Sequence, residues 1–283
     1  MGIIAVTGAT GQLGSRVARM LAERGARQRL VVRDPSRAPE LDGAEVAVAS
    51  YEDEAALRAA LAGVDTLFMV SAHESRDRMP EHRSAVRAAA AAGVERVVYT
   101  SFMGASPEAT FTFAREHAQT ERLIAESGLR MTALRNSLYA DMLPLFVQDG
   151  VIRGPAGRGR VAWVARRDVA RLAVATLLDA AHADRVYDVS GPDPLDLHES
   201  ARILGAVTGR EIAYVPETDE EARHSRAGAE DWQIAGWAGS YKAVATGETS
   251  VTSHTVEHVT GTRPWSLEEF LTNEPESWSH LVE

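Results

Sequence analysis

Residues 3–25 read IIAVTGATGQLGSRVARMLAERG, and this stretch decides the fold. Its first five residues form a short apolar run, which is typical of a strand that is buried on both faces. From residue 12 onward the apolar residues recur at helical spacing, and Gly25 is a helix stop signal. The turn between the strand and the helix carries three glycines with two residues between successive ones, namely Gly8, Gly11 and Gly14.

The same strand-and-helix pattern continues through the first half of the chain. Further strands are predicted at 29–33, 44–50, 65–71, 95–101 and 130–136. Helices are predicted at 53–63, 80–93 and 113–128. Alternation with short connections favours parallel strands joined by right-handed crossovers. The predicted fold is therefore α/β, a doubly wound parallel sheet of the Rossmann type with a smaller α+β C-terminal lobe.

The glycine spacing has a physical interpretation in this setting. Gly8 permits a tight turn off the strand, Gly11 lets a pyrophosphate approach the backbone, and Gly14 allows close packing of helix on strand. The N-terminus of the helix then offers N–H groups and a positive partial charge to phosphates. A glycine triplet alone only punctuates a loop, but here it lies in the first strand-to-helix turn, where a dinucleotide-binding motif is expected.

The end of the second predicted strand indicates which dinucleotide is bound. An NAD site places an acidic residue there for the ribose hydroxyls. This chain has Arg33, with Arg37 one helical turn further on. Asp34 is adjacent, but in the sequence RDPS it is better explained as a helix N-cap. Because a guanidinium suits a 2′-phosphate, the predicted cofactor is NADPH (NADP).

The domain prediction follows from where the alternation weakens. Residues 1–153 are predicted to form the NADP-binding Rossmann domain, and 161–190, a helix and a strand, are predicted to rejoin it. Residues 191–283 are predicted to form the smaller, substrate-binding lobe. The stretch LYADMLPLFVQDG (138–150) is predicted to be helical despite Pro144.

Composition narrows the classes of partner and metal site. The 283 residues carry a net charge of −10 and no cysteine, so nucleic acid is not an expected partner and thiolate chemistry is excluded. No apolar run approaches the roughly 20 residues of a membrane span, and no signal peptide is visible, so a cytoplasmic protein without a membrane partner is expected. His254 and His258 fall in an H-x-x-E-H motif, but the motif lacks its structural context, so no metal is predicted.

Several longer motifs, taken together, resemble a known family. They are TGATGQLG, VVRDPSRA, YEDEAALRAALAGVD, AAGVERVVYTS, TERLIAESGLRMTALRN and VTGTRPWSLEEFL. The chain resembles the NmrA-like branch of the atypical short-chain dehydrogenase/reductases, and within it the bacterial NADPH-dependent quinone oxidoreductases and triphenylmethane reductases. The resemblance implies NADPH at the glycine turn, Arg33 at the 2′-phosphate, and reduction of quinones or cationic dyes.

The usual catalytic pair of short-chain dehydrogenases is missing. No tyrosine has a lysine four residues on, and Lys242 is the only lysine of the chain. A hydride acceptor that needs little acid catalysis fits this sequence better, which favours a quinone-like or other flat conjugated small molecule. The protein would hold such an acceptor against the nicotinamide and exclude water.

Ligands of open α/β sheets bind at the carboxyl ends of the strands, and this rule selects the remaining candidates. The predicted cofactor-binding residues are Gly8, Thr10, Gly11, Gln12, Leu13, Gly14, Arg33, Ser71, Ala72, Thr100, Ser101 and Asn136. His73 and Tyr139 are candidate catalytic residues. The alternative for His73 is that it only contacts the cofactor, and the alternative for Tyr139 is that it only forms part of the pocket wall. A regulatory protein of the NmrA type, which binds NADP(H) without turnover, is the alternative function. The sequence predicts no oligomeric state.

Overall fold

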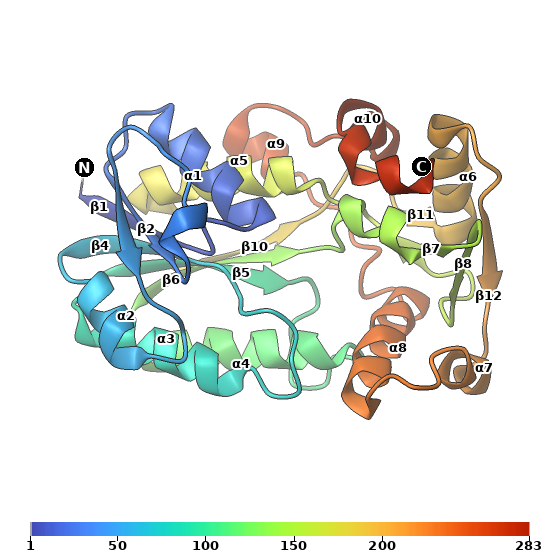
Figure 1. Cartoon of the computed structure of the whole chain (residues 1–283), viewed down its shortest axis with the longest axis horizontal. Coiled ribbons are helices and arrows are strands. Elements are labelled where there is room, and N and C mark those ends of the chain that lie inside the picture. The colour runs from blue at the N-terminus through green and yellow to red at the C-terminus, as the bar shows by residue number, and fades with distance from the viewer. Residues whose placement is uncertain (1, 283) are drawn as a thin grey trace. The chain divides into compact units, whose positions relative to one another are not determined.

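A computed structural model of the chain describes residues 2–282 (Figure 1). The chain divides into two compact units, which are described separately below. The first unit holds the residues up to Ser101, together with Glu116–Arg135 and Val169–Tyr187. The second unit holds Phe102–Arg115, Asn136–Asp168 and the residues from Asp188 onward.

The first unit is built on a seven-stranded sheet with the order β10-β6-β5-β4-β1-β2-β3. Its strands are β1 (Ile3–Thr7), β2 (Gln28–Val32), β3 (Ala44–Val48), β4 (Val64–Met69), β5 (Arg96–Phe102), β6 (Arg130–Asn136) and β10 (Arg185–Val189). Strands β3, β2, β1, β4 and β5 pair in parallel, each with the next. The strand order reverses direction between β1 and β4, which is the switch point where such sheets bind ligands.

Helices cover both faces of this sheet (Figure 1). They are α1 (Gln12–Ala22), α2 (Glu54–Ala60), α3 (Met79–Ala91), α4 (Thr112–Glu126) and α5 (Arg166–Leu178). Helices α1 and α5 lie on one face, and α2, α3 and α4 lie on the other. Every residue of β5 is buried, as expected for a strand with helices on both sides. The doubly wound Rossmann prediction is therefore confirmed.

The second unit contains short strands and five helices of its own. The strands are β7 (Val147–Gln148), β8 (Val151–Gly154), β9 (Arg160–Val161), β11 (Leu195–Asp196) and β12 (Ala213–Pro216). The helices are α6 (Leu197–Thr208), α7 (Asp219–His224), α8 (Asp231–Ala245), α9 (Thr255–Thr260) and α10 (Leu267–Asn273). Strands β12, β8 and β7 form one small sheet, and β11 pairs with β9 in another.

The prediction of a helix around Pro144 is wrong. The segment instead forms two 3₁₀ turns, Ala140–Met142 and Pro144–Phe146, followed by the hairpin β7–β8. Proline lacks the N–H that a continuing helix needs. Asp149 and Gly150 then adopt φ values of 50° and 74°, the positive values that a two-residue hairpin turn requires.

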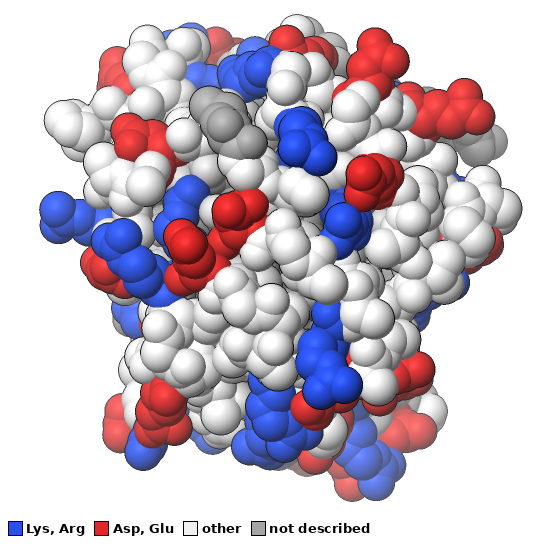
Figure 2. All heavy atoms as spheres, turned by 90° about the vertical axis from the view of Figure 1, so that its left-hand side faces the viewer, with Lys and Arg blue, Asp and Glu red and all other residues white. Residues whose placement is uncertain are grey.

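Charges of both signs are dispersed over the surface. On the face in Figure 2, basic and acidic side chains lie side by side, and no continuous basic stripe crosses it. Among the described residues, no helix combines the length and the apolar character that crossing a bilayer requires.

Candidate functional site

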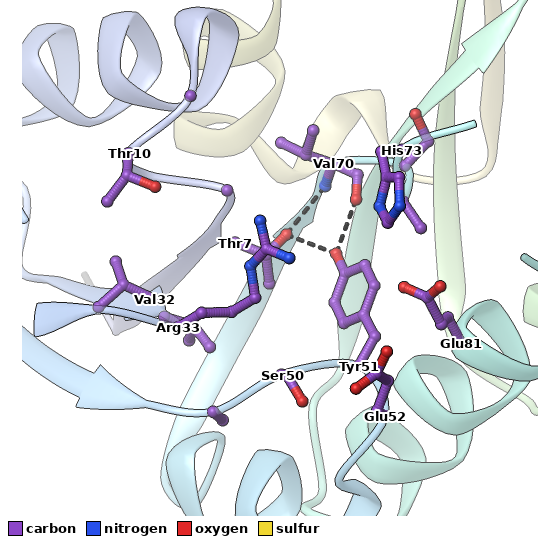
Figure 3. Close-up of a pocket in the computed structure, with 16 residues that line it drawn as sticks. Thr7, Thr10, Val32, Arg33, Ser50, Tyr51, Glu52, Val70, His73 and Glu81 are labelled. Atoms are coloured by element: carbon purple, nitrogen blue, oxygen red, sulfur yellow. Dashed lines mark hydrogen bonds between the residues drawn. The ribbon is translucent and has the colours of Figure 1, made fainter. Parts of the chain in front are cut away.

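A pocket opens in the first unit at the carboxyl ends of four parallel strands, β1, β2, β3 and β4 (Figure 3). The lining residues are Thr7, Gly8, Thr10, Gly11, Val31, Val32, Arg33, Ala49, Ser50, Tyr51, Glu52, Val70, Ser71, Ala72, His73 and Glu81. Six of the residues predicted to bind the cofactor are among them, together with His73. The pocket therefore opens at the edge of the sheet that the strand-end rule selects, the carboxyl ends of the strands.

The glycine turn has the geometry of an anion cradle. Gly8 adopts φ +62°, which a residue with a side chain rarely does. A Cβ atom on Gly14 would lie 2.2 Å from the carbonyl oxygen of Gly8, so the helix packs too close to the turn for any side chain there. Helix α1 begins after Gly11 with no side-chain cap and no acidic residue in its first turn. Its N-terminus therefore faces the pocket without a built-in negative charge.

Arg33 and Asp34 have different roles although they are neighbours. The Asp34 carboxylate accepts hydrogen bonds from the Ser36 N–H (3.0 Å) and the Ser36 hydroxyl (2.7 Å). These bonds lower the Asp34 pKa and make this residue the N-cap of the 3₁₀ turn Pro35–Arg37, as predicted. Arg33 is exposed, lines the pocket, and has no hydrogen bond or ion pair from its side chain within residues 2–282. A cation is thus available at the end of β2.

Tyr51 connects the ends of three strands beneath the pocket (Figure 3). Its hydroxyl donates to the Val70 carbonyl at 2.7 Å and lies 2.7 Å from the Thr7 hydroxyl. The Thr7 oxygen in turn accepts from the Val70 N–H at 2.9 Å. Burial raises the pKa of Tyr51, so the phenol is neutral and serves as a fixed hydrogen-bonding strut.

Comparison with known proteins agrees with this geometry. A family model described as NAD(P)H-binding matches residues 8–180. The chain is 38% identical over 220 residues to quinone oxidoreductase 2 of Escherichia coli (strain K12). The matched region covers 75% of this chain and 77% of that protein. The chain belongs to the NAD(P)H-binding family.

Two solved structures extend the likeness within this NAD(P)H-binding family. The NADPH complex of the E. coli NADPH-dependent quinone oxidoreductase has a TM-score of 0.87 and 33% identity, over 99% of this chain and 100% of that one. The Citrobacter sp. triphenylmethane reductase, complexed with NADP(H), has a TM-score of 0.83 and 31% identity, over 94% and 98%. The predicted resemblance to these two kinds of reductase is confirmed.

The loop after β4, residues 71–73, forms one wall of the pocket and is fixed at three backbone atoms. The Ser71 N–H donates to the Thr100 hydroxyl at 2.8 Å. The Ala72 N–H donates to Nε2 of His82 at 3.0 Å, and the Ala72 carbonyl accepts from Arg78 at 3.2 Å. Helix α3 and strand β5 therefore determine the position of this loop.

His82 holds this loop as a neutral acceptor. Its Nδ1 lies 2.7 Å from the Thr120 hydroxyl, which donates to the Glu116 carbonyl at 2.8 Å. Because the Thr120 proton is used there, we assign the imidazole proton to Nδ1, which leaves Nε2 free to accept from Ala72. Desolvation, with a smaller contribution from Arg78, lowers the pKa of His82 to about 3.

Thr100 and Ser101 lie within β5 and do not line the pocket in the described structure. Thr100 is buried and accepts from Ser71, so it supports the pocket wall. The hydroxyl of Ser101 is buried and donates to Glu121 at 2.5 Å. Gln12, Leu13 and Gly14 form the first turn of α1, where Leu13 and Gly14 are buried.

Asn136 is the last residue of β6 and the first residue of the segment Asn136–Asp168 in the second unit, where it contacts Tyr139. The Asn136 amide donates to the Tyr139 hydroxyl at 3.2 Å. The Arg166 guanidinium lies 4.1 Å from the centre of the Tyr139 ring and forms an ion pair with Asp141. Burial raises the pKa of Tyr139, and the charge of Arg166 acts in the opposite direction.

Five polar lining residues were not among the predicted site residues, namely Thr7, Ser50, Tyr51, Glu52 and Glu81. Thr7 and Ser50 are the last residues of the strands predicted at 3–7 and 44–50. Tyr51 and Glu52 directly follow the strand predicted at 44–50, so the strand-end rule would have found them. Glu81 lies in the first turn of helix α3, and its arrival at the pocket depends on how that helix packs. No sequence pattern indicates that placement.

Proposed function

We propose that this protein is an NADPH-dependent reductase that transfers hydride to a quinone-like or other flat conjugated acceptor. The observation that carries the proposal is the pocket at the ends of β1–β4, where an uncapped helix N-terminus and the unpaired Arg33 lie on one cavity. Relatives over 30% identical include a quinone oxidoreductase and a triphenylmethane reductase, which supports this acceptor class.

The preference for NADPH rests on Arg33. A guanidinium can bind a 2′-phosphate through two parallel hydrogen bonds. The neighbouring carboxylate of Asp34 would favour ribose hydroxyls, but it is already occupied by Ser36. The glycine turn from Gly8 to Gly14 would hold the pyrophosphate against the first turn of α1.

Bound NADPH would supply a hydride from its nicotinamide ring. The protein's contribution is then to bind and orient both reactants and to exclude water. No tyrosine-lysine pair at four-residue spacing exists in the chain, and Lys242 forms an ion pair with Asp219 at 2.7 Å. An acceptor whose reduction needs little acid from the protein is consistent with this.

The two candidate catalytic residues remain part of the proposal. Burial raises the pKa of Tyr139 and keeps the phenol protonated, and the Arg166 cation over its ring partly opposes this rise. His73 is exposed and lines the pocket, as do Tyr51 and Glu81. We infer that His73 contacts the cofactor, with proton donation by its imidazole as the alternative.

The test is NADPH oxidation, followed by the loss of reduced-nicotinamide absorbance, against a panel of quinones and triphenylmethane dyes. NADH is assayed in parallel, and NADPH binding is titrated on the same preparation. Turnover with a strong NADPH preference is expected. Tight binding with no turnover on any acceptor would instead favour a regulatory NADP(H)-binding protein, and no binding would contradict the assignment of the pocket.

A further inference from the structure

We propose that Glu81 recognises the adenine base of the dinucleotide by accepting a hydrogen bond from its exocyclic amine. The inference rests on the proposed NADPH-binding function and adds a specificity-determining residue to it. Glu81 would make the pocket select an adenine base over a base with an oxygen in place of that amine.

The Glu81 carboxylate is available to a ligand. It is half-buried, lines the pocket, and has no hydrogen bond or ion pair within the described part of the chain. Its negative charge interacts with Tyr51, another lining residue, and contributes to raising the pKa of that phenol. Figure 3 shows the carboxylate directed toward the cavity, on the side where His73 also lies.

The position of Glu81 in the pocket favours a contact with the base of the nucleotide over a contact with its phosphates. In the view of Figure 3, the Tyr51 ring lies between Arg33 and Glu81. All three residues line one pocket, so a nucleotide whose 2′-phosphate contacts Arg33 could place its base on the Tyr51 and Glu81 side. Apolar residues, among them Ala49, Val70 and Ala72, contribute to the lining of the same pocket, which suits the flat faces of a purine.

The hydrogen-bonding pattern of the base explains why a carboxylate would discriminate. Adenine presents an N–H donor at its 6-position, and a carboxylate can only accept. Hypoxanthine has a carbonyl oxygen there, which would meet the carboxylate as acceptor against acceptor. Glu52 is the other carboxylate of the pocket, but it is exposed, and solvent weakens its interactions.

A structural role for Glu81 is the competing explanation. The residue lies in the first turn of α3, where an acidic side chain stabilises the helix through its dipole. That role would lower stability on substitution but would not distinguish one base from another. The test therefore measures base preference and thermal stability on the same samples.

The experiment is calorimetric titration of the whole protein with NADPH and with its hypoxanthine analogue, deamino-NADPH. The variants are Glu81→Gln, Glu81→Asp and, as the matched control, Glu52→Gln. A hydrogen bond to a half-exposed carboxylate predicts that the wild type binds NADPH about tenfold more tightly than deamino-NADPH. In Glu81→Gln the ratio should approach one, because an amide can also donate to the oxygen. Glu81→Asp should keep a reduced preference for NADPH, and Glu52→Gln should keep the full preference.

Three results would overturn the inference. Equal wild-type affinities would exclude recognition of the amine, and an unchanged preference in Glu81→Gln would exclude Glu81. If only Glu52→Gln lost the preference for NADPH, Glu52 and not Glu81 would be the residue that recognises the amine. Since binding is measured without turnover, these failures leave the proposed reductase function standing, whereas absence of NADPH binding to the wild type would contradict both.

Discussion

Arg33 is the side chain on which the choice between the two nicotinamide dinucleotides depends. It is exposed at the pocket while the adjacent Asp34 is used as a cap. We expect Arg33→Ala to raise the Kd for NADPH about tenfold or more, because charge-assisted hydrogen bonds to the 2′-phosphate are lost. The Kd for NADH should change by less than about twofold, since NADH lacks that phosphate.

Arg37→Ala is the matched control for this prediction. Arg37 is an exposed arginine at the end of the 3₁₀ turn Pro35–Arg37, four residues after Arg33, and it does not line the pocket in the described structure. Fluorescence titration of both dinucleotides against both variants gives the comparison. Equal losses in the two variants would mean that general positive charge, and not a contact at Arg33, sets the preference.

Alanine substitutions of Gly11 and Gly14 should have different effects, one on NADPH affinity and the other on stability. In Gly14→Ala the new carbon would lie 2.2 Å from the Gly8 carbonyl oxygen, so helix and turn must separate, at about 1–3 kcal/mol of unfolding free energy. In Gly11→Ala the corresponding distance is 3.3 Å, so the fold should tolerate the change. The methyl group would still obstruct the pyrophosphate, and the Kd for NADPH should rise about tenfold.

Thermal denaturation and NADPH titration on both glycine variants separate the two effects. The prediction for Gly14 would be contradicted by an unchanged melting temperature. The prediction for Gly11 would be contradicted by wild-type affinity for NADPH. These outcomes also test how far the sequence interpretation of the turn holds, because the spacing alone assigned a separate role to each glycine.

At the level of elements, the loop after β4 depends on helix α3 for its position. His82→Leu removes the acceptor of the Ala72 N–H and leaves a buried donor unpaired, which costs about 1–3 kcal/mol. The Kd for NADPH should rise because the pocket wall loosens. His82→Gln retains a side-chain oxygen that can accept, and it should restore much of the affinity, which a purely space-filling role would not predict.

The same histidine should make stability depend on pH. Its folded pKa of about 3 lies below the unfolded value of about 6.5, so the unfolded chain binds the proton first. The stability that His82 contributes is therefore complete above pH ~6.5 and is lost as the pH falls, by up to about 1.4 kcal/mol per pH unit. His117, whose pKa is also lowered by burial, acts in the same direction.

Urea unfolding of the wild type and of His82→Gln between neutral and mildly acidic pH checks this dependence. The wild type should lose stability on acidification more steeply than the variant. Parallel curves for the two proteins would mean that His82 is not buried in its neutral form.

Sequence reasoning predicted some elements and missed others for physical reasons. Buried parallel strands and the residues just after them follow from local patterns, which is why Ser71, Ala72 and His73 were found. The support from His82 and Arg78 was not predicted, because it depends on how a helix packs against a loop. The hairpin at 147–154 was also missed, although Asp149-Gly150 is a typical two-residue turn and Pro144 argued against a helix.

At the scale of the whole molecule, neither compact unit is a continuous piece of chain. The chain leaves the first unit after Ser101, returns at Glu116, leaves again after Arg135, and returns once more for Val169–Tyr187. The sequence pattern predicted the strands of the sheet, but a long-range arrangement of this kind is visible only in contacts between distant residues. It has a consequence for any attempt to isolate the cofactor-binding part.

A fragment of residues 1–153 contains every residue that lines the pocket, yet we expect it not to bind NADPH. It lacks α5 and β10, which complete the first unit. In the whole chain, the buried Arg96 donates to the Thr176 and Leu177 carbonyls at 2.5 and 2.7 Å, at the end of α5. Without α5 the guanidinium loses both acceptors, and the apolar surface that packs against the buried residues of α5 would be exposed to water, which is destabilising. Circular dichroism should show no cooperative melting of the fragment, in contrast to the full chain under the same conditions. A fragment that melts cooperatively and binds NADPH with full-length affinity would show that α5 and β10 are dispensable for the pocket.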